Sequence, residues 1–73
     1  MLQMKDVLQV IEPSGILDGI KGNQLRRDVS DLMEKGASIV LVDLQNVSFM
    51  DSSGLVSILL ACKTVRSAGG KFY

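Results

Sequence analysis

The sequence predicts an α/β fold in which strands and helices alternate along one small domain. Three features support this class: an amphipathic helical pattern after a β-branched segment, a strand that is apolar on both faces, and a second, more apolar helical pattern after it. Alternation of this kind favours crossover connections and helices layered on a sheet. With 73 residues, the chain has room for a single domain with a modest core.

The first element is a strand at residues 7–11, a segment that is rich in β-branched residues and mostly apolar. Residues 13–15, Pro-Ser-Gly, interrupt it, and Pro13 cannot donate to a strand ladder. Apolar residues resume at 16–17, before Asp18 and Gly19 end the segment. We therefore expect one bent strand, or two short strands, between residues 7 and 17.

From Asn23 the apolar period changes to that of a helix. Apolar side chains recur at Leu25, Val29, Leu32 and Met33, while charged and polar residues cover the other face. Asn23 is an expected N-cap and Gly36 an expected C-terminal stop. This pattern predicts an amphipathic helix over residues 23–36.

Residues 38–44 are apolar on both alternating faces, which is typical of a strand covered on both sides in a parallel sheet. Residues 47–50 then lead toward Asp51-Ser52-Ser53-Gly54. Residues 55–68 are too long for a strand, and one helical stripe is expected to face the core: Leu55, Ile58, Leu59, Cys62 and Val65. Gly69-Gly70 ends this helix, and residues 71–73 are expected to open a further strand.

Composition excludes several classes of function. Eight basic and eight acidic residues cancel, and they are interspersed, so no net field favours nucleic acid or an anionic membrane. Apolar blocks are too short to span a bilayer. A single cysteine and no histidine leave no disulfide and no metal site, so we expect no cofactor. The unpaired cysteine and the absence of a recognisable secretory signal indicate the cytoplasm.

One segment, residues 51–54, is a candidate functional site. Asp51-Ser52-Ser53-Gly54 stands between the buried strand and the most apolar helix, where open α/β sheets place their sites. Free backbone N–H groups at a helix start tolerate negative charge, so a serine there is suited to phosphorylation. Asp and Ser before a helix are also ordinary caps, and taken alone this motif is more often a cap than a regulated site.

The motif resembles a family signature. Residues 49–55, Phe-Met-Asp-Ser-Ser-Gly-Leu, preceded by the strand at 39–44, are similar to the signature of STAS domains, and more closely to that of the bacterial anti-sigma factor antagonists. Upstream, residues 15–18, Gly-Ile-Leu-Asp, are similar to the family's Gly-Glu-Leu-Asp strand end, with Ile16 in place of Glu. The resemblance runs from about residue 7 to residue 73 and implies a STAS-like mixed sheet with helices.

The resemblance also implies a mechanism. In that family an anti-sigma factor with serine-kinase activity binds the unphosphorylated antagonist and releases its sigma factor. Phosphorylation of the motif's second serine breaks the complex, and a phosphatase restores it. On this chain the phosphorylated residue is then Ser53, and the partner-binding residues are Asp18, Asp51, Ser52, Ser53 and Gly54. Gly54 is expected to let a partner's backbone or a phosphate approach closely.

Family domains usually begin with an extra strand and continue past the fourth strand with further strand and helices, which residues 1–73 lack. We therefore expect residues 1–73 to be an incomplete STAS domain. Either they are a fragment, or a second chain completes them by association or swapping, as a homodimer or larger assembly.

Two other interpretations compete with a switch controlled by phosphorylation of Ser53. The same fold could serve as a non-switching interaction or scaffolding module in which Ser53 is only a cap. An enzyme is disfavoured because a serine nucleophile needs a nearby base, and the chain has no histidine and no Gly-x-Ser-x-Gly elbow. Cys62 lies on an apolar stripe without basic neighbours and is interpreted as a core residue.

Overall fold

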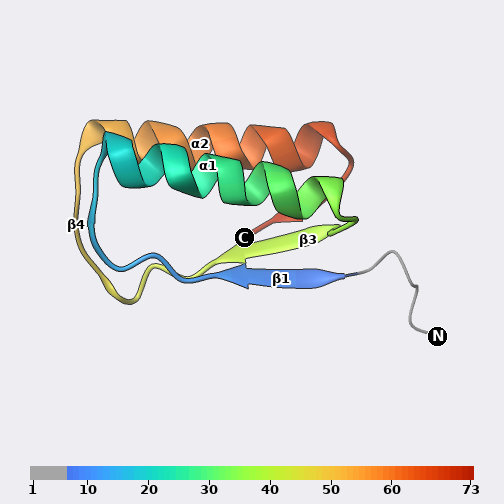
Figure 1. The fold of residues 1–73 in the computed structure, drawn as a ribbon, viewed down its shortest axis with the longest axis horizontal. Coiled ribbons are helices and arrows are strands. Elements are labelled where there is room, and N and C mark those ends of the chain that lie inside the picture. The colour runs from blue at the N-terminus through green and yellow to red at the C-terminus, as the bar shows by residue number, and fades with distance from the viewer. Residues whose placement is uncertain (1–6) are drawn as a thin grey trace.

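The computed structural model describes residues 7–73 and confirms the α/β class (Figure 1). Two helices of equal length alternate with short strands. The elements are β1 (Leu8–Ile11), β2 (Gly15–Leu17), α1 (Gly19–Glu34), β3 (Ile39–Val42), β4 (Val47–Met50), α2 (Ser52–Ser67) and β5 (Lys71–Phe72).

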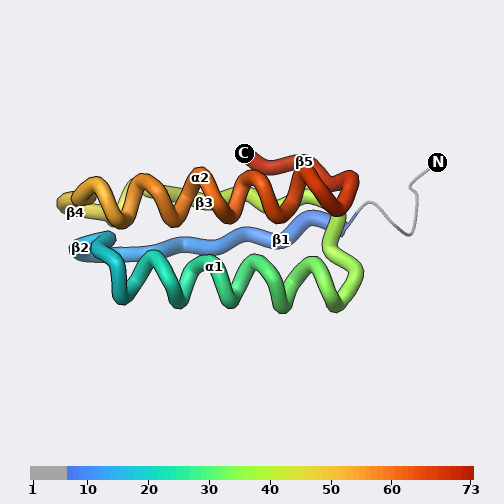
Figure 2. The backbone as a smooth tube through the Cα atoms, turned by 90° about the horizontal axis from the view of Figure 1, so that it is seen from above, coloured from blue at the N-terminus to red at the C-terminus, as the bar shows by residue number. Residues whose placement is uncertain are grey.

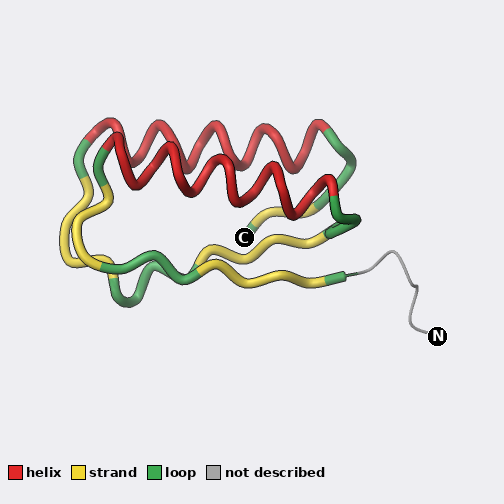
Figure 3. The backbone as a smooth tube through the Cα atoms, viewed as in Figure 1, coloured by secondary structure: helices red, strands yellow, loops and turns green. Residues whose placement is uncertain are grey.

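The strands form two separate parallel groups (Figure 3). The larger sheet has the order β1-β3-β5, with Val10 opposite Leu41 and Val40 opposite Phe72. β2 pairs with β4, and a register shift lies between Gly15 and Ile16. The segment from residue 7 to 17 is thus two strands with different partners, and every strand pair formed within residues 7–73 is parallel.

Both helices lie side by side on one face of the larger sheet and start at the same end of the molecule (Figures 1 and 2). The buried core between these layers draws on α1, β3 and α2: Leu25, Val29, Val40, Ala61 and Val65. Ile11, Val42 and Phe72 pack against it.

The expectation of a strand covered on both faces is wrong for β3. Val40 is fully buried, whereas Leu41, which points the other way, is 37% exposed. Its neighbours on that side, Leu8 and Val10 of β1, are also exposed. The apolar pattern of β3 therefore reflects one face covered by helices and one apolar face that residues 7–73 leave partly exposed.

The first helix begins earlier than its apolar pattern predicts. α1 starts at Gly19 with Asp18 as the N-cap, so Asn23 is an exposed residue inside the helix. Its predicted end is confirmed, because Gly36 adopts φ 98°, a left-handed conformation that glycine tolerates. The sequence pattern missed the first turn because Gly19, Ile20, Lys21 and Gly22 do not continue the apolar stripe.

The structure also contains a repeat that the sequence does not display. Each helix follows a short strand and an aspartate cap, and Asp51 follows Asp18 by 33 residues (51 minus 18). Both helices are 16 residues long, and both end before a left-handed glycine, Gly36 or Gly69. Residues 47–50, expected only as a lead into the motif, form β4 as the counterpart of β2.

Candidate functional site

Ser53 lies in the first turn of α2 and is exposed. The helix begins at Ser52, because the side chain of Asp51 caps it: the Gly54 N–H donates to Asp51 Oδ1 at 2.8 Å. This bond uses one free N–H of the helix start, and the Leu55 N–H donates to the Asp51 carbonyl oxygen at 3.1 Å. The Ser53 hydroxyl therefore stands at the positive end of a capped helix.

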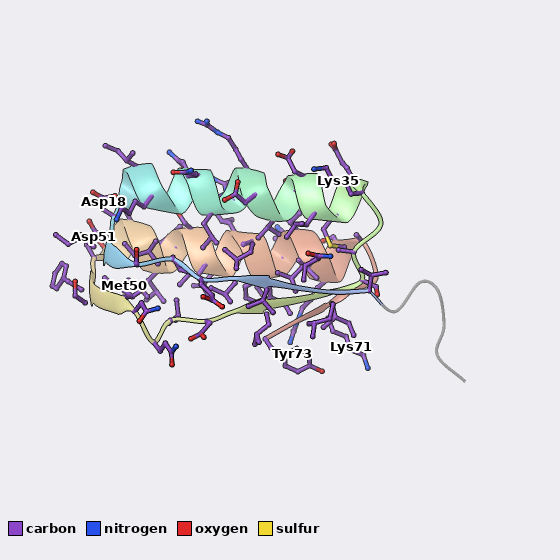
Figure 4. The ribbon with its side chains drawn as sticks, turned by 60° about the horizontal axis from the view of Figure 1, so that its bottom comes forward. Asp18, Lys35, Met50, Asp51, Lys71 and Tyr73 are labelled. Carbon is purple, nitrogen blue, oxygen red and sulfur yellow. The ribbon has the colours of Figure 1, made fainter. Side chains whose placement is uncertain are left out.

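Asp18 occupies the equivalent place on α1. The Lys21 N–H donates to Asp18 Oδ1 at 3.0 Å, which caps the first turn. The two helix starts touch: a Cβ atom built on Gly19 would lie 3.6 Å from the Cβ atom of Ser53. Figure 4 shows Asp18 and Asp51 at the same end of the molecule. The structure thus brings the predicted residues Asp18, Asp51, Ser52 and Ser53 into one cluster.

Gly54 has a different environment from the one expected. It is buried, and a Cβ atom there would overlap the carbonyl oxygen of Leu17 and lie 2.9 Å from the Leu17 carbonyl carbon. The same carbonyl oxygen accepts the Asp51 N–H at 3.3 Å. The close approach that Gly54 permits is therefore to the carbonyl group of Leu17 in the chain's own β2, and Gly54 is buried beneath the exposed serines.

The apolar stripe of α2 is rotated from its predicted position. Leu55 and Leu59 are exposed, at 51% and 60%, while the residues facing the core are Gly54, Ser57, Ala61 and Val65. Small residues lie inward because α1 approaches closely: a Cβ atom on Gly22 would lie 2.6 Å from the Ser57 Cβ atom. The predicted stripe is confirmed at Val65, which is buried, and at Ile58, which packs against the core, but it is wrong at Leu55 and Leu59.

The exposed apolar residues surround the motif. They come from β2, α1, β4 and α2: Ile16, Ile20, Phe49, Leu55, Val56, Leu59 and Leu60. Ile20, in the first turn of α1, is 80% exposed. The sequence pattern did not predict this apolar surface, although two residues signal it: Ile16 stands where the family has Glu, and Ile20 lies outside the apolar stripe of α1. An exposed apolar surface of this kind is typical of a protein-binding site.

A shallow pocket of about 360 Å³ lies between the N-terminal halves of the two helices. Its lining comes from one face of each helix: Gly19, Asn23, Arg26, Ser52, Ser53, Val56, Ser57 and Leu60. Within residues 7–73 no three His, Cys, Asp or Glu side chains gather in a way that would hold a metal ion. Across the same residues, neither helix is long and apolar enough to cross a bilayer.

Comparisons with known proteins agree with this geometry. The family model of the STAS domain matches residues 1–73. The phosphorylated form of SpoIIAA, a Bacillus cell fate determinant, is similar in structure, with a TM-score of 0.75 and 24% identity over 97% of this chain. The unphosphorylated form of SpoIIAA, an anti-sigma factor antagonist, gives a TM-score of 0.75 and 25% identity over 99% of this chain.

This chain spans 65% and 64% of the length of those two structures. The strand order, the capped second helix and the Asp-Ser-Ser-Gly motif at its start lie together within the matched region. The chain belongs to the STAS domain family.

Proposed function

We propose that this chain is a protein-binding switch of the anti-sigma factor antagonist type, controlled by phosphorylation of Ser53. In its unphosphorylated form it binds an anti-sigma factor with serine-kinase activity, and a phosphatase reverses the modification. Two similar structures support this proposal: one is described as an anti-sigma factor antagonist, and the other is of the same protein in a phosphorylated form.

The observation that carries the proposal is the position of an exposed serine within an apolar surface. Ser53 stands in the first turn of α2, and Val56 one turn further is 51% exposed. Phe49 and Ile20, from β4 and α1, add apolar area near the same helix starts. A partner that covers this surface must also cover Ser53, so a phosphate there would place about two negative charges inside the interface.

In this proposal the chain supplies the hydroxyl group that accepts the phosphoryl group, and the partner kinase catalyses the transfer. The Ser53 Oγ atom forms a bond to the γ-phosphorus of a nucleoside triphosphate, the bond to the bridging oxygen breaks, and the serine proton leaves to a base of the kinase. We propose that the chain itself is not an enzyme and that it acts in the cytoplasm. Asp18, Asp51 and Ser52 shape the surface around Ser53, and Gly54 acts only by packing against Leu17.

Binding measurements on charge variants test the switch. Ser53→Asp should weaken binding to the cognate anti-sigma factor by about tenfold or more, because a negative charge enters the interface without a partner. Ser53→Ala should bind as the parent chain does but resist phosphorylation. Ser67→Asp places the same charge at the far end of α2 and should bind normally. Equal binding by all three variants would exclude electrostatic control.

The exposed apolar surface also favours a second candidate, a non-switching STAS scaffold in which Ser53 is only part of the helix start. Incubation with the cognate kinase and nucleoside triphosphate, followed by intact mass measurement, separates the two. One phosphate on the parent chain and none on Ser53→Ala supports the switch. No phosphate on the parent chain after exhaustive incubation supports the scaffold.

A further inference from the structure

The pocket between the helix starts has a composition suited to an anion. Gly19, Asn23 and Arg26 lie at i, i+4 and i+7 on α1, so they share one face, and Ser53 and Ser57 lie one turn apart on the facing side of α2. The lining contains one cation, Arg26, and no carboxylate. Glycine at position 19 leaves the entrance between the helices without a side chain.

A buried hydroxyl at the base of this pocket provides an independent observation. Ser57 is only 5% exposed, yet its hydroxyl has no hydrogen-bond partner among the residues that the structure describes. No fully sealed side-chain oxygen or nitrogen in that part of the chain lacks a partner, so the Ser57 Oγ atom is not completely sealed from solvent. This atom lies against Gly22 of α1, where the two helices meet, and Ser57 lines the pocket beside that contact. A nearly buried donor of this kind, beside an open pocket, is suited to an incoming acceptor.

We propose that this pocket receives the phosphoryl group carried by Ser53, which Arg26 and Asn23 of α1 and the hydroxyl of Ser57 bind across the groove between the helices. The proposal rests on phosphorylation of Ser53 as the proposed function. Arg26 supplies the opposite charge, Asn23 an amide donor and Ser57 a hydroxyl donor, and a phosphate has oxygens for all three. Phosphorylation then links α1 to α2, as well as adding charge to the partner surface.

The other charges near this position oppose the phosphate or lie away from it. Asp18 and Asp51 cap the two helices and contribute negative charge, although each already accepts a backbone N–H. The ammonium group of Lys21 donates to the Ser14 carbonyl oxygen at 2.8 Å, on the side of α1 facing the loop before β2. Arg26 is the one cation that lines the pocket, so its removal should have the largest effect on the ionisation of the phosphate.

The test uses the full chain with phosphoserine placed at position 53 by chemical synthesis, so that no kinase is needed. A ³¹P NMR titration measures the second pKa of the phosphate, which is about 6 for an unperturbed phosphoserine. Arg26 should hold that pKa lower, and Arg26→Gln should raise it by about 0.5 unit. Arg27→Gln removes the same charge from the neighbouring position, which does not line the pocket, and should leave the pKa unchanged.

Equal shifts in Arg26→Gln and Arg27→Gln, or none in either, would overturn the proposal, because the phosphate would then sense only the net charge of the chain. Ser57→Ala removes one donor without adding atoms, and it should raise the phosphate pKa by a smaller amount than Arg26→Gln. Circular dichroism checks that each variant is folded.

A second measurement separates the bound phosphoserine from a free phosphate ligand. Millimolar inorganic phosphate added to the unmodified chain should leave the amide resonances of Asn23 and Ser57 in place. Saturable shifts that disappear in Arg26→Gln would assign the pocket to free phosphate and overturn the link to Ser53. Since the phosphoserine is synthetic, failure of a kinase to modify Ser53 would refute the proposed switch without changing these results.

Discussion

The carbonyl oxygen of Leu17 occupies the place where a side chain at position 54 would stand. Gly54 is therefore required by packing between β2 and α2, and this requirement holds whether or not a partner binds. In the motif Asp51-Ser52-Ser53-Gly54, the first residue caps the helix and the last lets it lie against β2. Within the motif only Ser52 and Ser53 are exposed, which leaves Ser53 accessible for modification.

Gly54→Ala should therefore destabilise the fold, because the new methyl group overlaps backbone atoms that cannot move away easily. We expect the free energy of unfolding to fall by about 1–3 kcal/mol or more, measured by urea denaturation. Gly19→Ala is the matched control, since its Cβ atom would make an ordinary contact of 3.6 Å with Ser53. A Gly54→Ala chain as stable as the parent would contradict the packing role.

Asp51 can be tested as a cap separately from its charge. Asp51→Ala removes the acceptor of the Gly54 N–H, and the free energy of unfolding should fall by about 1 kcal/mol. Asp51→Asn keeps an oxygen acceptor and should lose only a few tenths of that amount. Thermal or urea denaturation provides the comparison. If Asp51→Asn is as unstable as Asp51→Ala, the negative charge matters more than the hydrogen bond.

At the scale of elements, the helical and strand periods predicted both helices and most strands, but they missed β4 and did not predict which side of α2 is buried. Leu59 was assigned to the buried face of α2 because it continues an apolar stripe, whereas the structure buries Gly54, Ser57 and Ala61. Small residues of α2 face inward because α1 lies so close to it. The apolar periodicity within α2 does not reveal which element packs against that helix. Likewise, the start of α1 at Gly19 depends on the Asp18 cap and on packing of Gly22 against Ser57.

Truncation of two apolar residues on α2 tests this orientation. Val65 is fully buried, so Val65→Ala should lower the free energy of unfolding by about 2 kcal/mol. Leu59 is 60% exposed, so Leu59→Ala should change it by less than about 0.5 kcal/mol. Both variants are read out by urea denaturation. A larger loss of unfolding free energy in Leu59→Ala than in Val65→Ala would contradict this orientation of α2 and support burial of Leu59.

At the scale of the whole molecule, both helices cover one face of the β1-β3-β5 sheet (Figure 1), and no helix or strand among residues 7–73 covers its other face. Leu8, Val10 and Leu41 on β1 and β3 are exposed there, and Tyr73 follows β5 at the same sheet. The apolar pattern of residues 38–44 predicted the strand β3 correctly, but it also led to the wrong expectation that both faces of this strand are covered. Hydropathy reports that a face avoids water, and it does not identify what covers that face.

We predict that a second copy of the chain covers this open face. Equal numbers of basic and acidic residues give a net charge of zero, so two copies do not repel each other strongly, and burial of Leu8, Val10 and Leu41 would remove apolar area from water. Light scattering at micromolar concentration should give the mass of two chains or more.

Leu41→Lys places a charge in the middle of the open sheet face and should yield the mass of one chain. Leu59→Lys adds the same charge on the exposed side of α2 and should leave the assembly intact, because that helix lies on the opposite side of the sheet. A single-chain mass for the parent protein would rule out self-association, whereas dissociation by Leu59→Lys alone would move the interface to the apolar surface around Ser53.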